Sequence, residues 1–265
     1  MNKKISIIII TILLTMNVLV LVFSNLFKDD EIIERPNVNE PLEKKGQYIS
    51  INNISNILFD NGNFKKVNAN NLNNNQVNAY INGNYIGTYY LKKGRIWNLF
   101  DENDKYINYD GKLLVNSTNL NMIVRNIEKV NITDNELQYL ESLLDKDIKL
   151  DELMYNEMVI VDLDNNGYKD KIVYVSNLDS NEERDLYYNV IFMEMNGQKS
   201  VILNRKIEIE DYYLEPVYSI EYVLNINNTQ NDSVVFERSY FSNVGETGNI
   251  IIGYQNNAFF VQYDD

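Results

Sequence analysis

The sequence contains no cysteine and no histidine, and it has only three prolines among its 265 residues. Without cysteine the chain forms no disulfide, carries no lipid anchor on an N-terminal cysteine and has no thiol nucleophile. Without histidine as well, it lacks the usual nitrogen and sulfur ligands of zinc and the most common general base. Carboxylates, hydroxyls, amides and amines therefore carry whatever chemistry the chain performs.

Positive charge is also scarce. The chain has 24 lysines and arginines against 38 acidic residues, and its formal net charge is -14. Residues 28–265 hold 22 of the basic residues and all 38 acidic ones, which gives this part a net charge of -16. Nucleic-acid binding depends on clusters of Lys and Arg that contact phosphates, so we expect no nucleic-acid partner. An acidic surface attracts cations instead.

The N-terminus contains one long apolar run, residues 5–27, which follows a lysine pair and precedes an acidic triplet. As a helix, this run would reach about 35 Å, enough to cross a bilayer. The positive-inside rule then keeps the N-terminus cytoplasmic and places the rest of the chain outside. We predict that residues 1–27 form an uncleaved transmembrane signal anchor and that residues 28–47 form an extracytoplasmic linker. A cleaved signal peptide is the alternative.

Residues 48–132 consist of short β-branched and aromatic runs separated by turn signals, which predicts a β-rich region. Asn61-Gly62, Asn82-Gly83 and Asp110-Gly111 are each expected to turn a hairpin. The aromatic residues are densest in residues 79–97. Aromatic side chains are typical of strands that pack in a core. A Tyr/Trp surface that stacks on the sugar rings of a wall polymer is the alternative.

A helical connector is expected at residues 133–156. Thr133 and Glu136 have the spacing of a capping box, and leucines recur at helical spacing after them. We therefore predict a helix from Asp134 to about Asp145. Further hairpins are expected around Asn196-Gly197 and around residues 255–257.

The most informative stretch is 162–170, Asp-Leu-Asp-Asn-Asn-Gly-Tyr-Lys-Asp, which lies between the apolar runs 158–161 and 172–175. Calcium takes six to eight oxygen ligands at about 2.3–2.6 Å, and a tight loop of this composition offers them. Val173 stands where an EF-hand requires its bidentate glutamate, so the loop is not an EF-hand. An ordinary Asn-Gly hairpin turn is the alternative. The expected ligands are Asp162, Asp164, Asn166, the backbone carbonyl of Tyr168, and Asp170.

A second, weaker copy of this stretch follows. Residues 224–236 align with residues 161–174 after one deletion, at an offset of 63 residues. Asn225 then corresponds to Asp162, and Asp232 corresponds to Asp170. A fixed period is the sequence signature of repeat architectures. The second loop has lost the glycine and two carboxylates, so we expect it to bind no metal.

These two loops resemble the calcium loops of FG-GAP/VCBS-type repeats, which occur in integrin-like β-propellers and in bacterial surface proteins. The resemblance covers roughly residues 157–265. It implies propeller-blade-like antiparallel repeats in this region and a Ca²⁺ ion in the first loop. A seven-bladed ring at this period needs more residues than the chain has, so we expect no complete closed propeller.

Together these features predict a mainly β protein with one or two short helices and an N-terminal transmembrane helix. The predicted function is a membrane-anchored extracytoplasmic module with a structural Ca²⁺ ion. It would serve in binding, adhesion or scaffolding, with a cell-wall polymer or a surface protein as its partner. The alternative is a carboxylate-based hydrolase that acts on envelope glycans. Such an enzyme needs two carboxyl groups about 5–10 Å apart, and the sequence singles out no such pair.

Overall fold

The computed structural model describes residues 46–52, 54–144, 155–178, 186–208, 214–240, 247–255 and 258–264. The chain divides into two compact units, residues 1–42 and 43–265, and every described residue belongs to the second. The predicted anchor, residues 1–27, lies outside the described residues, as does nearly all of the predicted linker. Among the residues that are described, none form a helix long and apolar enough to cross a membrane.

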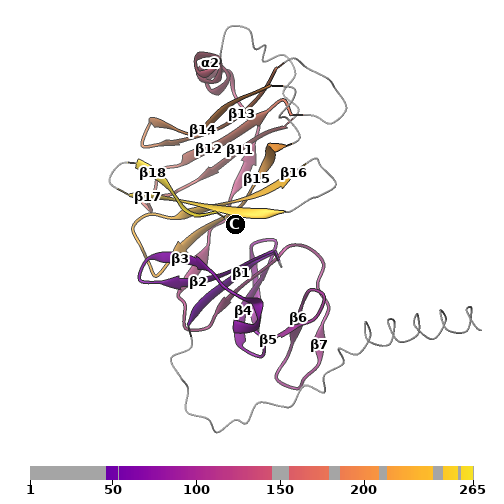
Figure 1. Ribbon diagram of the computed structural model, residues 1–265. Helices are drawn as coiled ribbons and strands as arrows, with labels where there is room; N and C mark the ends of the chain where they lie inside the picture. The colour runs from indigo at the N-terminus through magenta and orange to yellow at the C-terminus, as the bar shows by residue number, and fades with distance from the viewer. Residues whose placement is uncertain are drawn as a thin grey trace, which may run out of the picture. The chain divides into compact units, whose positions relative to one another are not determined.

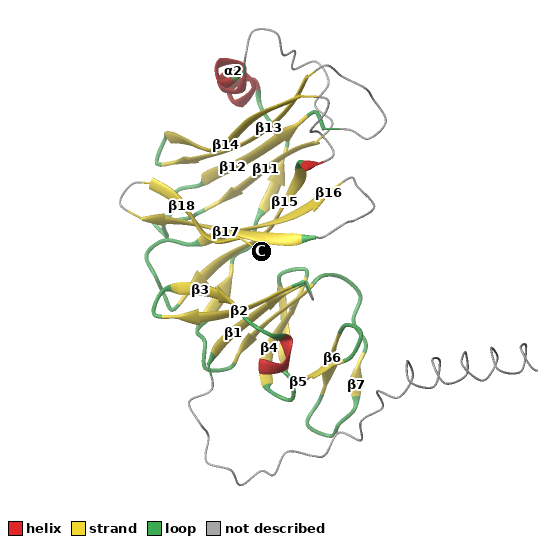
Figure 2. Ribbon diagram, in the orientation of Figure 1, coloured by secondary structure: helices red, strands yellow, loops and turns green. Residues whose placement is uncertain are grey.

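The described residues are mainly β, as predicted (Figure 2). The first of three antiparallel sheets, here the N-terminal sheet, has the strand order β3-β2-β1-β8-β4-β5-β6-β7. Its strands are β1 (Gln47–Ile51), β2 (Ser55–Asp60), β3 (Asn63–Lys66), β4 (Gln76–Ile81), β5 (Asn84–Lys93), β6 (Trp97–Phe100), β7 (Tyr106–Ile107) and β8 (Leu113–Ser117). A short 3-10 helix, η1 (Ala69–Asn71), precedes β4.

The other two sheets share one topology. Each is a four-stranded meander to which a short strand from residues 122–130 is added at one edge. The outer sheet consists of β10 (Glu128–Val130), β11 (Tyr155–Val161), β12 (Asp170–Ser176), β13 (Leu186–Met195) and β14 (Gln198–Glu208). The middle sheet consists of β9 (Met122–Val124), β15 (Pro216–Ile226), β16 (Ser233–Tyr240), β17 (Gly248–Gln255) and β18 (Ala258–Asp264). In both, the loop between the first two strands of the meander is one of the two loops aligned above.

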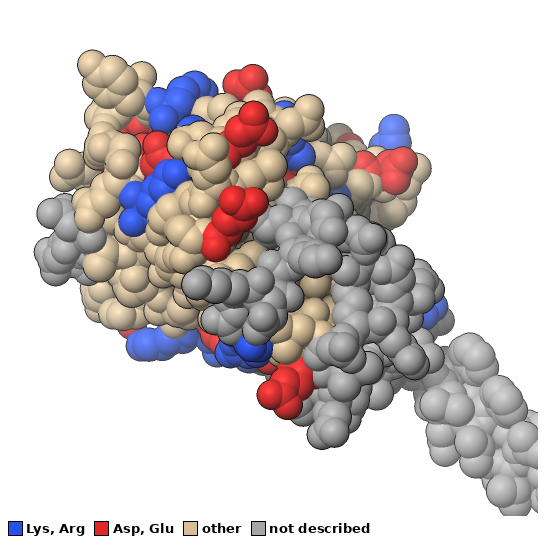
Figure 3. Space-filling model, turned by 90° about the horizontal axis from the view of Figure 1, so that it is seen from above, with Lys and Arg blue, Asp and Glu red and all other residues tan. Residues whose placement is uncertain are grey.

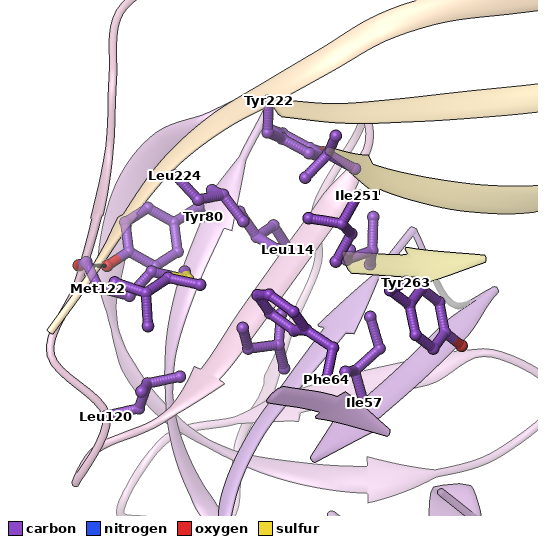
Figure 4. Packing of buried hydrophobic residues seen from close by; sticks show 14 residues of the cluster. Ile57, Phe64, Tyr80, Leu114, Leu120, Met122, Tyr222, Leu224, Ile251 and Tyr263 are labelled. Carbon is purple, nitrogen blue, oxygen red and sulfur yellow. Dashed lines mark hydrogen bonds between the residues drawn. The ribbon is translucent and has the colours of Figure 1, made fainter. Parts of the chain in front are cut away.

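The sheets are stacked, with the middle sheet between the other two (Figure 1). Side chains of β16 show this arrangement, because Val234 and Phe236 pack toward the outer sheet while Val235 packs toward the N-terminal sheet. The N-terminal sheet contributes Ile57 and Leu114 to the latter core (Figure 4). Residues from both the 48–132 and the 157–265 ranges therefore share one buried core.

Three of the predicted Asn-Gly hairpins are confirmed. They join β2 to β3, β4 to β5 and β13 to β14, and in each turn the Asn and the Gly both have positive φ. Such angles match the twist of paired strands in two-residue turns. Strands β17 and β18 pair with each other up to Gln255 opposite Ala258, which agrees with the hairpin predicted there.

The hairpin predicted at Asp110-Gly111 is wrong. The strand after it, β8, pairs with β1 and β4 and not with the preceding β7. Leu113, Leu114 and Val115 are all buried, so this strand lies at the centre of its sheet, between two apolar cores. Burial on both faces outweighs the local turn signal, which carries no information on the partner strand.

The aromatic stretch 79–97 divides between the two interpretations. Trp97 is buried, and its indole N–H donates to the hydroxyl of Ser50 at 2.9 Å. Tyr80 is buried as well, whereas Tyr85 and Tyr90 are exposed. The core interpretation therefore holds for the tryptophan, and a continuous Tyr/Trp surface is not formed.

The predicted helix is confirmed as α2 (Asp134–Leu143), with both halves of its capping box. The helix packs through Leu140 on the face of the outer sheet that points away from the middle sheet. Glu136 has a fully buried side chain, which contacts Thr133 and pairs with Lys171 at 2.7 Å. Burial alone would raise the pKa of Glu136, but hydrogen bonds from Lys171 and Thr133 outweigh it and lower this pKa to about 2.

We expect Glu136→Gln to lower the free energy of unfolding by about 2 kcal/mol at neutral pH, because it removes a charge-assisted hydrogen bond. The folded-state pKa is below the ordinary value of 4.5, so the stabilisation is present above that pH. It is lost as the pH falls toward 2. Urea unfolding at several pH values measures this change, with Glu141→Gln on the exposed side of α2 as the control. If Glu136→Gln lost no more free energy of unfolding than Glu141→Gln, or lost the same amount at every pH, the Glu136–Lys171 pair would not be the source of the stabilisation.

Candidate metal centre

The candidate site is the loop 162–169 between β11 and β12, whose strands end on the pair Val161 and Asp170. Leu163 points into the core between the outer and middle sheets and is 2% exposed, which anchors the loop. Asn165 and Gly167 have φ angles of 56° and 87°. A Cβ at Gly167 would meet nothing within 4 Å, so glycine suits this position through its backbone conformation and not through lack of space.

Three of the five predicted ligands come together. Asp162, Asp164 and Asp170 each offer a carboxylate oxygen, and these oxygens lie within 4.8 Å of one another. Two ligands on opposite sides of a calcium ion are separated by about 4.8 Å, so a single ion can bridge this distance. Among the described residues, no Lys or Arg forms an ion pair with any of these three aspartates.

Backbone N–H groups hold two of the carboxylates. Asp162 accepts from the N–H of Asn166 at 3.0 Å and from that of Gly167 at 2.9 Å. Asp170 accepts from the N–H of Leu163 at 2.8 Å and from that of Asn196 at 3.2 Å. The loop thus holds these carboxylates in a preorganised cup in which Asp162, Asp164 and Asp170 all carry negative charge.

Asp164 is held less completely. Its Oδ2 accepts from the side-chain amides of Asn166 at 2.9 Å and Asn196 at 2.8 Å. Its Oδ1 is buried and has no hydrogen-bond partner. A buried carboxylate oxygen without a partner costs free energy, so this atom is a point at which a cation would stabilise the loop.

The pKa of Asp170 also reflects the crowding of negative charge in this loop. The residue is 3% exposed, and burial raises the pKa of its carboxyl group. The N–H groups of Leu163 and Asn196 lower this pKa, while the carboxylates of Asp164 and Asp162 raise it, and the net shift is upward. Negative charge is therefore crowded at this end of the outer sheet.

The side chain of Asn166, another predicted ligand, is engaged in hydrogen bonds within the loop. Asn166 turns its amide nitrogen toward Asp164, while its Oδ1 accepts from the N–H of Tyr168 at 2.7 Å. An amide nitrogen cannot ligate a cation, so Asn166 must rotate its amide to serve as a ligand. At Tyr168 the predicted ligand is the backbone carbonyl, which stays a prediction, and the side chain is 75% exposed.

Asn196 is a residue of the site that the sequence did not indicate. It lies in the turn between β13 and β14, and its side chain bonds to both Asp164 and Asn166. Pairing of β13 with β12 brings this turn beside the loop, with Glu194 opposite Lys171. The sequence predicts the turn, but no local pattern predicts which loop the turn will contact.

The second loop supplies an internal comparison. Asp232, which corresponds to Asp170, is also 3% exposed. Its Oδ2 pairs with Nε of Arg125 at 2.7 Å, and its Oδ1 accepts from the amide of Asn225 at 2.6 Å. Here the guanidinium of Arg125, from the segment between β9 and β10, balances the buried carboxylate.

The two loops also contact each other directly. The N–H of Asp232 donates to the carbonyl of Leu163 at 2.8 Å. Arg125 reaches the first loop as well, because its Nη2 donates to Oδ1 of Asn165 at 3.4 Å. The two loops are therefore joined by one main-chain and one side-chain hydrogen bond.

The described residues thus form three stacked antiparallel sheets, with three aspartates brought together in the loop between β11 and β12. A scan against protein-family models, a search of curated proteins and a search of solved structures each found no match to this chain.

We expect Arg125→Ala to destabilise the protein by about 3 kcal/mol, since it leaves the buried carboxylate of Asp232 without a counter-charge. The double variant Arg125→Ala/Asp232→Asn should recover most of this loss, because it removes the charge as well. Equilibrium unfolding in urea provides the comparison. A double variant that is no more stable than the single one would show that Arg125 does not act by neutralising Asp232.

Proposed function

We propose that Asp162, Asp164 and Asp170 hold one structural Ca²⁺ ion that stabilises the β11–β12 loop. The observation that carries the proposal is the contrast between two equivalent loops. In the second, Arg125 balances the buried carboxylate; in the first, no Lys or Arg among the described residues does so. Three crowded carboxylates that pair with no Lys or Arg of the described residues are stabilised by a cation from solution.

The donor set favours calcium over other ions. All donors are oxygens, and the absence of cysteine and histidine removes the soft and nitrogen ligands that transition metals prefer. Calcium tolerates irregular geometry and takes six to eight oxygens, whereas magnesium demands a near-ideal octahedron. Beyond the three carboxylates, the remaining ligands would come from water, the Tyr168 carbonyl and the side-chain oxygens of Asn166 or Asn196.

We infer a structural and not a catalytic role for this ion, in a membrane-anchored extracytoplasmic module for binding, adhesion or scaffolding. The anchor rests on the apolar run 5–27, and the surface role rests on the resemblance to FG-GAP/VCBS-type repeats. On the face seen in Figure 3, basic and acidic side chains are interspersed, and the described residues visible there form no basic patch. This distribution fits a partner other than nucleic acid.

The hydrolase remains the second candidate, but the cavities of the described part favour it little. Cavities of about 290 and 500 Å³ are each lined by a single acidic residue, Asp232 and Glu221 respectively. Each of these carboxylates pairs with a basic residue, Arg125 or Lys112. Glycoside hydrolysis needs two carboxyl groups that face one substrate.

Calcium should raise the melting temperature of the full-length protein relative to EDTA, and magnesium should do so much less. For an extracellular module with a dissociation constant of about 10⁻⁴ M, about 1 mM calcium stabilises by about 1.4 kcal/mol. In a domain of this size, that corresponds to a shift of about 3–6 °C. Thermal melts in EDTA, CaCl₂ and MgCl₂ measure it, and equal melting temperatures would contradict the proposal.

The variant Asp162→Asn/Asp164→Asn should abolish this calcium-dependent shift. Its melting temperature in EDTA serves as its own metal-free baseline, because asparagine relieves the carboxylate repulsion but also replaces an oxygen of Asp162 that accepts a backbone N–H. Glu102→Gln/Asp110→Asn removes the same charge from exposed positions outside the loop and should keep the full shift. A shift retained by the loop variant would place the calcium elsewhere.

A further inference from the structure

A groove of about 290 Å³ lies where the N-terminal sheet meets the middle sheet, apart from the candidate metal centre. Its lining comes from three segments that are distant in sequence. The hairpin β2–β3 contributes Phe59 and Phe64, the second loop contributes residues 229–232, and the hairpin β17–β18 contributes Tyr254, Phe260 and Gln262. The groove therefore exists only in the folded stack of sheets.

Aromatic rings form the apolar part of this groove. Phe64 is 8% exposed and packs in the core shown in Figure 4. The ring of Phe59 lies 5.2 Å from that of Phe64. Phe260 is 42% exposed and offers an accessible ring. Flat apolar rings with an accessible face are suited to stacking on the carbon-bound hydrogens of a sugar ring.

Side-chain amides form the polar part. Gln230, Asn231 and Gln262 line the groove, and side-chain amides carry donors and acceptors that match the hydroxyls of a saccharide. The Asn231 amide also donates one hydrogen bond to the carbonyl of Tyr254 at 3.2 Å. Gln262 is oriented by Ser233, whose hydroxyl lies 2.8 Å from its Oε1. A Cβ at Gly253 would approach the Gln262 amide to 2.3 Å, so the glycine leaves room for this amide to lie against β17.

The groove carries almost no net charge. Its lining contains no Lys or Arg, and its one acidic residue, Asp232, is neutralised by Arg125. The chain as a whole has a net charge of -14, which disfavours anionic ligands. The neighbouring cavity of about 500 Å³ is lined by Lys112, Arg125 and Lys129. All three pair with carboxylates, so that cavity does not favour anions either.

We propose that this groove binds one or two rings of a neutral saccharide. Its volume lies near the lower limit of small-molecule sites, which is about 300 Å³. The second loop lacks two of the three carboxylates of the first, and it places Thr229, Gln230 and Asn231 along the groove. The inference rests on the proposed role as a binding module, but it does not depend on the calcium ion.

The test is calorimetric titration of the full-length protein with chitotetraose, cellotetraose and maltotetraose, and with tetragalacturonate as the anionic probe. At least one neutral tetrasaccharide should bind, and the anionic one should not. Phe260→Ala and Gln262→Ala should each weaken that binding at least tenfold. Val261→Ala alters the neighbouring exposed residue of β18. Tyr85→Ala removes an exposed ring of β5 that does not line the groove. Both control variants should bind the saccharide with a dissociation constant within about twofold of that of the native chain.

Failure to bind any neutral tetrasaccharide would overturn the inference, as would binding that Phe260→Ala and Gln262→Ala leave unchanged. Titrations in EDTA and in calcium separate this inference from the metal site. Saccharide binding without a calcium-dependent melting shift would reject the ion and retain the groove. A calcium shift without saccharide binding would do the reverse.

Discussion

The middle sheet is the constraint on which the rest of the structure depends. Its two faces are buried, one against the N-terminal sheet and one against the outer sheet. Alternation along β16 sends Val235 to one core and Val234 and Phe236 to the other, and each such side chain contributes about 1.5–3 kcal/mol when buried. A register slip of one residue would exchange the two faces and disrupt both cores.

The stacking also places the two aligned loops against each other. Because the outer and middle sheets have the same strand order, each loop leaves its sheet at the same point of the meander. The link from Asp232 to the carbonyl of Leu163 then joins them. The buried carboxylates of Asp170 and Asp232 thus have different charged neighbours in one molecule. One has an arginine, and the other has two more carboxylates.

Much of the fold was predictable because its signals are local. Asn-Gly pairs predict three of the hairpins, because both residues readily adopt positive φ. The Thr133–Glu136 capping box predicts the start of the helix. The approach of Asp162, Asp164 and Asp170 follows from their spacing around one tight turn. In contrast, the partners of β8 and the position of Asn196 depend on which strands pair across the sheet, and sequence proximity does not determine such pairing.

The pairing of Arg125 with Asp232 could not be predicted from the sequence either. Arg125 precedes Asp232 by 107 residues, and only the docking of the 122–130 segment across both sheets brings them together. The groove at the β2–β3 and β17–β18 hairpins is of the same kind, because its three walls come from distant segments. The chemistry of each residue was visible in the sequence, but the neighbours of each residue were not.

Whether the loop between β11 and β12 holds one calcium ion is best tested by the calcium stoichiometry of the EDTA-treated full-length protein, measured by titration calorimetry. We predict one ion per chain, since no Lys or Arg of the described residues pairs with the aspartates of the first loop, whereas Arg125 pairs with Asp232 in the second. A stoichiometry of zero would show that the acidic loop is an ordinary turn. A stoichiometry of two that falls to one when Asp232 is changed to Asn would show that the guanidinium does not take the place of a metal ion.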